Sequence, residues 1–308
     1  MRVKFWAALA LVALTSGCGT SASRVLAEAP YMGTRSAAND DLRSLPPPAQ
    51  KLTVAVFAFL DQTGQHKPNE NYADYSFAVT QGGASILINA LKDAGQQSWF
   101  TVLERNRLGD LFQERQIIRA NREEAAQRSG QPMNALGPLM NAGVIFEGGI
   151  IGYDANTLTG GVGANFLGIG GSTQYRKDDV AVYLRVISVL TGEVLVSLTT
   201  EKTIYSVGLD GSVNKYVGYN KLLQVEAGFT TNEPGQLAVK QAIELAVRSA
   251  ILDGASRGYW HFADDAKGQP LIDHYVAERD GRILPAISAS SPGGTKKVTD
   301  SVTGGHPS

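Results

Sequence analysis

The sequence predicts an α+β domain that is interrupted by two segments resembling neither a helix nor a core strand. A β-branched and aromatic run at 51–60 is typical of a buried strand, whereas 237–252 carries a single apolar stripe at helical spacing. Many of the 34 glycines fall between Gly143 and Gly235, around the two unusual segments. The 308 residues leave room for one large domain or two smaller ones after an export signal.

The first half of the domain alternates strands and helices. After the strand at 51–60, apolar residues at helical spacing predict a helix over 82–94, and a β-rich run predicts a strand at 100–103. Asn106 is a suitable N-cap for a further helix that runs to about residue 120.

The second half is predicted to begin with a strand at Val144. Two long β-rich arms around Thr191-Gly192 then predict a hairpin over 180–204. The helix at 237–252 follows, and Gly254 is expected to end it.

Both ends of the mature chain are predicted to lie outside the packed domain of residues 51–263. The N-terminal part, 18–50, is rich in Ala, Ser and Pro and is expected to form an extended arm. The C-terminal part, 264–308, is polar and rich in Pro, Gly and Ser, and we expect a mobile tail.

Residues 1–17 have the organisation of a secretory signal peptide. A short basic start precedes an apolar run at 5–14, which is too short to span a membrane, and small residues follow. Cys18 comes next, so the segment resembles the lipobox of bacterial lipoproteins, although Leu14 lies four rather than three residues before the cysteine. The resemblance implies a lipid on Cys18, and Gly19 implies sorting to the outer membrane. An ordinary cleaved signal with an incidental cysteine is the alternative.

Composition argues against several function classes. The net charge of −1 gives no field that favours nucleic acid, and the single cysteine excludes an intramolecular disulfide. No glycine-rich segment completes a dinucleotide or phosphate-binding motif. The four histidines are scattered without ligand spacing, and no nucleophile lies beside a base, so we expect neither an enzyme nor a cofactor. These histidines are His66, His261, His274 and His306.

The two unusual segments, at about 157–177 and 207–227, alternate apolar with small or polar residues. That pattern suits a barrel strand between lipid and lumen, although soluble amphipathic hairpins look the same and are favoured on alternation alone. Lys215 breaks the second pattern and is expected to mark a turn or rim. Four strands cannot close a barrel, so a membrane role requires several protomers to pool their strands. Candidates for an interfacial aromatic girdle are Phe166, Tyr175, Tyr205, Tyr216 and Tyr219.

Short motifs in order from about 51 to 260 resemble CsgG, the family of curli secretion channels. The most specific is Asp61-Gln62-Thr63-Gly64-Gln65 with Lys67-Pro68. The other matching segments are 90–93, 103–105, 114–120, 150–153, 160–164, 173–175, 181–186 and 230–234. The long tail suggests a relative of the main family, such as the holdfast-anchor HfaB branch.

The resemblance implies an outer-membrane lipoprotein with a periplasmic domain, assembled as a homo-oligomeric ring that is nonameric in the family. Each protomer would contribute two transmembrane β-hairpins, which coincide with the two unusual segments, to one large barrel. The implied partners are secreted adhesin or amyloid subunits, periplasmic and surface accessory proteins, and outer-membrane lipid. Two uses remain open: an ATP-independent export channel, or a ring that anchors adhesins without conducting them.

In this family the loop after Pro68 projects inward and forms the pore constriction. Alignment on the residues that follow places Asp74 and Tyr75 at two constriction positions. Asn69 or Glu70 aligns with the first, and Tyr72 is a shifted substitute. Rings of tyrosine with an acidic ring would hold an unfolded chain loosely and favour cations. The alternative is a polar surface loop with two incidental tyrosines.

Overall fold

The computed structural model describes residues 35–65, 79–159, 174–209, 213–217 and 234–283. All of the elements below belong to one compact unit, Ser36–Ser308. Cys18 and the loop residues Asn69, Tyr72, Asp74 and Tyr75 lie outside the described residues.

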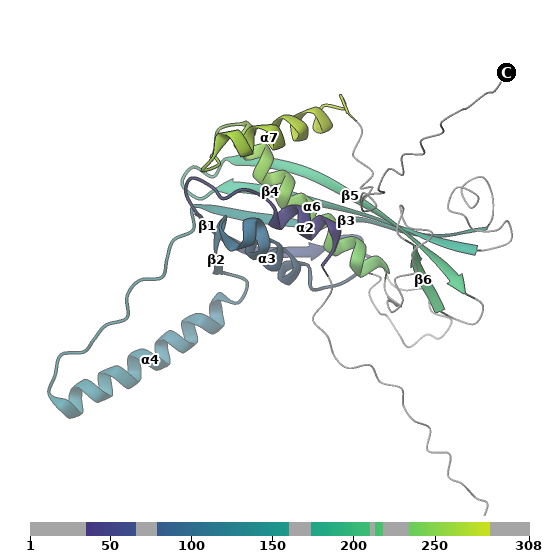
Figure 1. Ribbon diagram of the computed structural model, residues 1–308. Coiled ribbons are helices and arrows are strands. Elements are labelled where there is room, and N and C mark those ends of the chain that lie inside the picture. Colours follow the sequence, from purple (N-terminus) through teal and green to yellow (C-terminus); the bar gives the residue numbers. More distant parts are fainter. Residues whose placement is uncertain (1–34, 66–78, 160–173, 210–212, 218–233, 284–308) are drawn as a thin grey trace, which may run out of the picture. The chain divides into compact units, whose positions relative to one another are not determined.

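A six-stranded mixed sheet forms the centre of the fold (Figure 1). Its order is β2-β1-β3-β4-β5-β6, and β1 runs parallel to both β2 and β3, whereas every later pair is antiparallel. The strands are β1 (Leu52–Asp61), β2 (Phe100–Glu104), β3 (Val144–Thr159), β4 (Gln174–Ser188), β5 (Val194–Leu209) and β6 (Val213–Val217). The predicted strands at 51–60, 100–103 and from Val144 are therefore confirmed, as is the hairpin around Thr191-Gly192.

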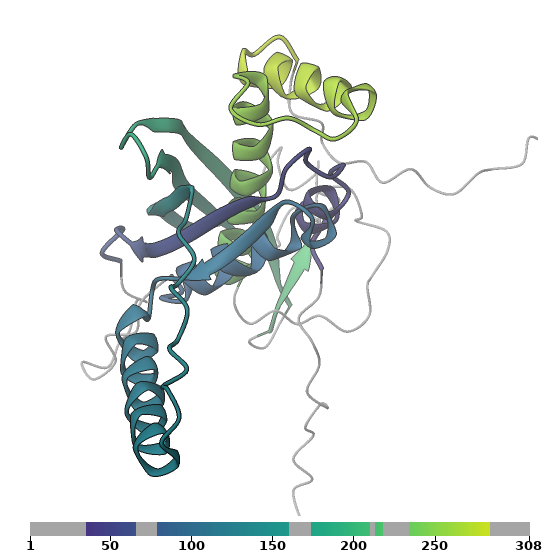
Figure 2. The ribbon, with the colours of Figure 1, turned by 90° about the vertical axis from the view of Figure 1, so that its left-hand side faces the viewer.

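Helices cover one face of this sheet (Figure 2). Two of them, α3 (Gly83–Asp93) and α6 (Pro234–Ser256), pack against the strands and against each other, and a short 3-10 turn (Ala94–Gln97) follows α3. In β4 the residues that face the helices are buried, and those between them are only partly covered or exposed. This alternation with period two shows that the helices cover one face and leave the other open.

The N-terminal arm is shorter than predicted, because residues 36–49 belong to the folded domain. Helix α2 (Ala37–Arg43) buries Leu42 completely, and Leu45 is 4% exposed. The segment that follows α2 pairs with a distant part of the chain, since Ala49 donates its N–H to the His261 carbonyl at 2.9 Å. The apolar residues of this stretch are few and close to prolines, so no periodic pattern reveals them in the sequence.

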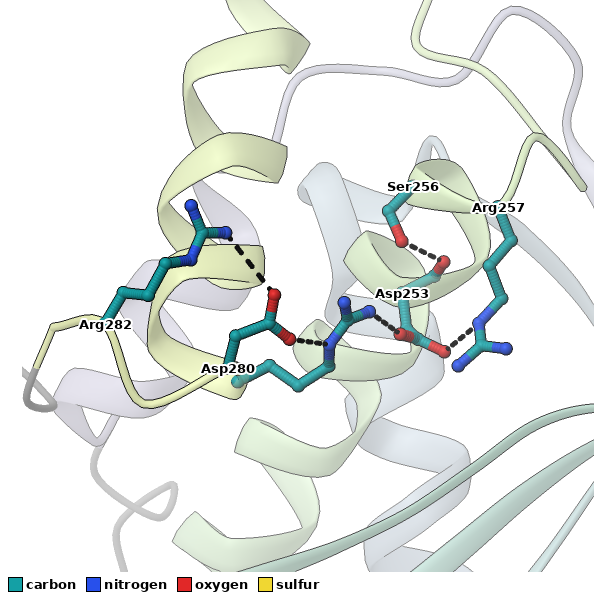
Figure 3. Close-up of polar contacts among 6 residues, drawn as sticks. Asp253, Ser256, Arg257, Asp280 and Arg282 are labelled. Atoms are coloured by element: carbon teal, nitrogen blue, oxygen red, sulfur yellow. Dashed lines mark hydrogen bonds and ion pairs between the residues drawn. The ribbon is translucent and has the colours of Figure 1, made fainter.

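The prediction of a mobile tail from residue 264 is wrong for α7 (Asp265–Arg279), which packs against α6. Buried Asp253 of α6 accepts hydrogen bonds from Arg257 Nε at 2.7 Å and from Arg279 Nη1 at 3.0 Å (Figure 3). Arg279 also pairs with Asp280 at 2.9 Å. Burial, followed by the charge of Asp253, raises the pKa of Tyr275 in the same contact. Arg279 thus fastens α7, a helix of largely polar composition, to the buried carboxylate of α6, and Arg257 pairs with the same carboxylate from the end of α6 itself.

Gly254 does not end α6 but lies inside it, against Trp260. A Cβ at this position would lie 1.9 Å from Trp260 Cζ2, so the glycine makes room for the indole. The indole N–H of Trp260 donates to the Ile251 carbonyl at 2.7 Å, which fixes the ring over the helix. The helix continues past Gly254 because packing overrides the tendency of glycine to terminate helices.

Helix α4 (Leu108–Ser129) has no buried residue and is longer than the predicted 106–120. Asn106 does not cap it, because the N-cap position is Arg107, which makes no side-chain capping bond. The segment that returns from α4 is held to it by arginine side chains. Arg105, Arg115 and Arg122 donate to the carbonyls of Met140, Gly137 and Asn134, respectively.

Candidate functional site: the mouth of the 66–78 loop and the bases of the hairpins

The two described ends of the 66–78 loop are joined by the carboxylate of Asp61, the last residue of β1. One oxygen of Asp61 accepts hydrogen bonds from the Thr63 N–H at 2.9 Å and the Thr63 hydroxyl at 2.7 Å. The other oxygen accepts from Gln81 Nε2 at 3.1 Å, on the far side of the loop. Because one side chain bonds to both ends, it fixes the spacing of the loop mouth.

Gln62 fastens the same mouth to the sheet. Its backbone N–H donates to the Ile150 carbonyl at 2.9 Å, which continues the pairing of β1 with β3. Its side-chain amide donates to the Tyr183 hydroxyl at 3.2 Å. The guanidinium of Arg185 lies 5.3 Å from the centre of the Tyr183 ring, so the tyrosine is supported from a second side.

Helix α3 starts two residues after Gln81 and packs closely on the end of β1. A Cβ at Gly83 would lie 2.7 Å from Phe59 Cδ1, and one at Gly148 would lie 2.4 Å from the Tyr183 carbonyl oxygen. Both glycines therefore allow the close approach that buries Phe59 beneath the loop mouth. The base of the loop thus rests on the core of the domain, and the loop leaves from a rigid support.

Replacing Asp61 with alanine is expected to loosen the loop mouth without unfolding the domain. The change removes three hydrogen bonds, each worth about 0.5–1.5 kcal/mol, at a partly exposed site. Limited proteolysis should cut within 66–78 several times faster, while the Tm shifts by only a few degrees. Asp110→Ala, an exposed carboxylate of α4, is the matched control. Equal cleavage of the Asp61 variant and the wild-type protein would contradict the role of this side chain.

Strands β3 and β4 pair from the core to the ends of the first unusual segment, with one irregularity between Ile150 and Gly152. The register runs from Val144↔Ser188 to Thr159↔Gln174, and residues 160–173 between them lie outside the described part. At about 3.3 Å per residue, the 16 residues of β3 reach roughly 50 Å, much longer than an average strand. The described ends of the predicted hairpin at 157–177 are therefore paired antiparallel, and the rest of the hairpin stays a prediction.

The second unusual segment is also antiparallel at its start. Strand β5 pairs with β6 from Tyr205↔Val217 to Leu209↔Val213, and residues 210–212 between them lie outside the described part. Lys215 pairs with Val207 inside the ladder, so the expectation of a turn at Lys215 is wrong, and the alternative of a rim stays a prediction.

Polar groups gather where β3, β4 and β5 leave the helix-covered core. Asp178, which is fully buried, accepts a hydrogen bond from the Tyr153 hydroxyl at 2.8 Å. On the opposite face, Asp179 accepts from the Thr203 hydroxyl and pairs with Lys177 Nζ at 2.6 Å. Burial lowers the pKa of Lys202 in the same region. These polar residues lie between the buried core and the ends of the strands that extend beyond it.

The described ranges offer little for catalysis. Within them, no three His, Cys, Asp or Glu side chains are grouped closely enough to hold a metal ion. No helix in these ranges is both long and apolar enough to cross a membrane. The described residues support the ends of the 66–78 segment and the strands that lead into the two unusual segments.

The family model for the curli production assembly/transport component CsgG matches residues 35–277. The chain belongs to the CsgG family. The CsgG protein of Escherichia coli K12 is 41% identical over 261 residues, a match covering 85% of this chain and 92% of that protein. The protein from Salmonella typhimurium LT2 is 41% identical over 263 residues, with the same coverage. A hypothetical Chlamydia trachomatis protein, CT253, matches 67% of this chain and 97% of its own with a TM-score of 0.33, too low to carry an argument.

The family prediction made from short motifs is thus confirmed for this CsgG-family chain. The α+β class is also confirmed, with a mixed open sheet. The assignments of Cys18 as the lipid site and of Asn69, Tyr72, Asp74 and Tyr75 as the constriction stay predictions, because they lie outside the described residues. In the sequence, Asp61 stands out only as part of the family motif. The signal for its role was its position directly after a buried strand and before Gln62-Thr63-Gly64.

Proposed function

We propose that this chain is an outer-membrane lipoprotein whose copies assemble into an ATP-independent export channel for unfolded adhesin or amyloid subunits. The observation that carries the proposal is 41% identity over 85% of the chain to proteins named curli production assembly/transport components. The long paired strands that extend beyond the helix-covered core would continue into two membrane hairpins per protomer. The polar residues around Asp178 and Asp179 suit the junction of a periplasmic domain with a barrel.

Ring formation is supported by two uncovered surfaces of different shape. Helix α4 leaves Phe112 50% exposed and Ile117 47% exposed. Between α4 and its return segment lies a groove of about 610 Å³, lined by apolar residues and by Arg115 and Arg119. On the open side of the sheet, Leu60 is 62% exposed.

Contacts between two different patches of one chain are heterologous, and a closing rotation turns them into a ring. Each protomer would offer α4 to the open sheet face of its neighbour. Pooling of hairpins then removes the free strand edges that would otherwise be left in lipid. Projection images of detergent-extracted protein test this step: we expect closed rings, and a monomer under conditions that preserve the fold would contradict the channel.

Lipid on Cys18 is proposed to keep each protomer at the membrane until enough neighbours gather to close a barrel. Cys18→Ala should therefore give soluble, folded protein that does not form rings, because two anchoring signals bind a membrane far better than one. Circular dichroism and size-exclusion chromatography check the two halves of this expectation. Normal rings from the alanine variant would show that the lipid is dispensable for assembly.

The constriction is proposed to lie at Asp74 and Tyr75, with Tyr72 and Asn69 beside them. Replacing Asp74 and Tyr75 together by alanine should raise single-channel conductance, on the order of twofold, because the narrowest part of a pore sets its resistance. Cation preference should also fall with the loss of the carboxylate ring. Ser76→Ala, at the end of the same loop, is the control. Unchanged conductance in the double variant would place the constriction elsewhere.

A structural anchor is the second candidate: a lipoprotein ring that tethers holdfast or adhesin proteins without conducting them. The resemblance to the holdfast-anchor branch favours it. The same assembly and the same hairpins would serve this role, so only conduction or export separates the two candidates.

A further inference from the structure

A buried polar cluster joins the first helix of the domain to the longest. Glu244 of α6 is 1% exposed, and Ser36 and Asn39, at the start of α2, are 6% and 4% exposed. The Ser36 hydroxyl donates to Glu244 Oε2, and Asn39 Nδ2 donates to Glu244 Oε1 at 3.2 Å. These are contacts between residues more than 200 positions apart in the sequence.

A second carboxylate shares the same amide. Asn39 Nδ2 also donates to Asp93 Oδ2 at 3.0 Å, so one neutral side chain bridges Glu244 and Asp93 of α3. Two cations face this pair. Arg43 of α2 contacts Asp93 Oδ1 at 2.5 Å, and Lys240 of α6 lies 3.9 Å from Glu244 Oε1. The cation in close contact therefore serves Asp93 rather than Glu244.

We propose that Glu244, Ser36 and Asn39 form a proton-dependent latch that fastens α2 to α6. The residues and contacts that carry this inference lie wholly within the domain, so it stands whether or not the assembled protein conducts. Its consequence concerns the chain that precedes it, because only the 17 residues 19–35 separate Cys18 from Ser36. The latch would thus set how firmly the N-terminal segment is attached to the core.

The direction of the pH dependence follows from the surroundings of Glu244. Burial raises the pKa of its carboxyl above the ordinary value of 4.5, and the charge of Asp93 adds to the effect. The hydrogen bonds from Ser36 and Asn39 and the charge of Lys240 act the other way but are outweighed. A carboxyl that binds its proton more tightly when latched must latch more tightly when protonated. The stabilisation is complete below pH 4.5 and is lost as the pH rises through the raised pKa.

Glu244→Gln removes the titrating carboxyl and keeps a side chain that can make the same two contacts. Glutamine keeps an oxygen that can accept from Asn39 and an amide that can donate to Ser36, so it imitates the protonated carboxyl. Ser36→Ala removes the hydroxyl and leaves the titrating group in place. Glu114→Gln, on exposed α4, changes the same charge far from the latch and is the control.

Hydrogen exchange of peptides covering 36–45 tests the latch between about pH 5 and about pH 8, after correction for the intrinsic exchange rate. In the wild-type protein and in Glu114→Gln, corrected exchange should rise several-fold towards the higher pH. In Glu244→Gln it should stay at the slow, low-pH rate throughout, and in Ser36→Ala it should be faster than in the wild-type protein at both ends. A wild-type rate that does not change with pH would overturn the proposal. So would an unchanged pH response in Glu244→Gln, or a wild-type rate in Ser36→Ala.

Discussion

Leu158→Arg is expected to abolish pores, whereas Thr159→Arg, one residue further along β3, should leave them intact. Successive side chains of a strand point to opposite faces, so in the proposed barrel the alternation of 157–166 would place Leu158 toward lipid and Thr159 toward the lumen. An arginine on the lipid face costs about 2–4 kcal/mol at mid-depth and about 0–1 kcal/mol near the interfaces. Leu158 lies near the start of the proposed span, so the cost in each protomer is at the lower end of this range. Every protomer of the ring carries the substitution, so the penalty recurs around the barrel and the barrel should fail to insert.

The two variants share the strand, the new side chain and the change in net charge, so they differ only in the face that is altered. Planar-bilayer recordings should show no channels for Leu158→Arg, and channels with reduced cation preference for Thr159→Arg. Circular dichroism should show the helices of the domain in both proteins. If both variants conduct alike, or if both lose conduction, the assignment of membrane and lumen faces is wrong.

Gly254→Ala is expected to destabilise the domain by about 1–3 kcal/mol or more through overpacking against Trp260. The added methyl group would lie 1.9 Å from a rigid ring atom that is itself fixed by a hydrogen bond to Ile251. The indole must therefore move. Its displacement would break the hydrogen bond from the indole N–H to the Ile251 carbonyl.

Gly109→Ala makes the same chemical change in another helix and should have the opposite sign. A Cβ at Gly109 meets no atom within 4 Å, so the substitution should stabilise the protein by up to about 1 kcal/mol through helix propensity alone. Urea denaturation measures both effects. Equal Gly254→Ala and wild-type stabilities would show that the Trp260 contact carries no energetic weight.

Periodic apolar patterns predicted the elements whose stability depends on burying a whole face. The strand at 51–60 and the helix at 237–252 belong to this class, and both are present. The confirmed family assignment likewise depends on motifs that are local in sequence. Patterns within a segment are visible without the fold, which is why these features could be predicted.

Elements held by a few contacts to residues far away in the sequence were missed. Helix α2 is seven residues long and depends on Glu244, and α7 is polar and depends on Asp253. Gly254 was assigned as a helix end because its partner, Trp260, is recognised only once the ring is placed over the helix. The loop mouth behaves in the same way, because the contact between Asp61 and Gln81 spans 20 residues without any periodic signal.

The central claim is that copies of this chain form a conducting pore. Single-channel recording of the purified, image-verified ring in a planar bilayer tests it most directly. Large, stable and ungated conductance steps are the predicted result. Well-assembled rings that insert and give no conductance would contradict the export channel and leave the structural anchor as the function of the assembly.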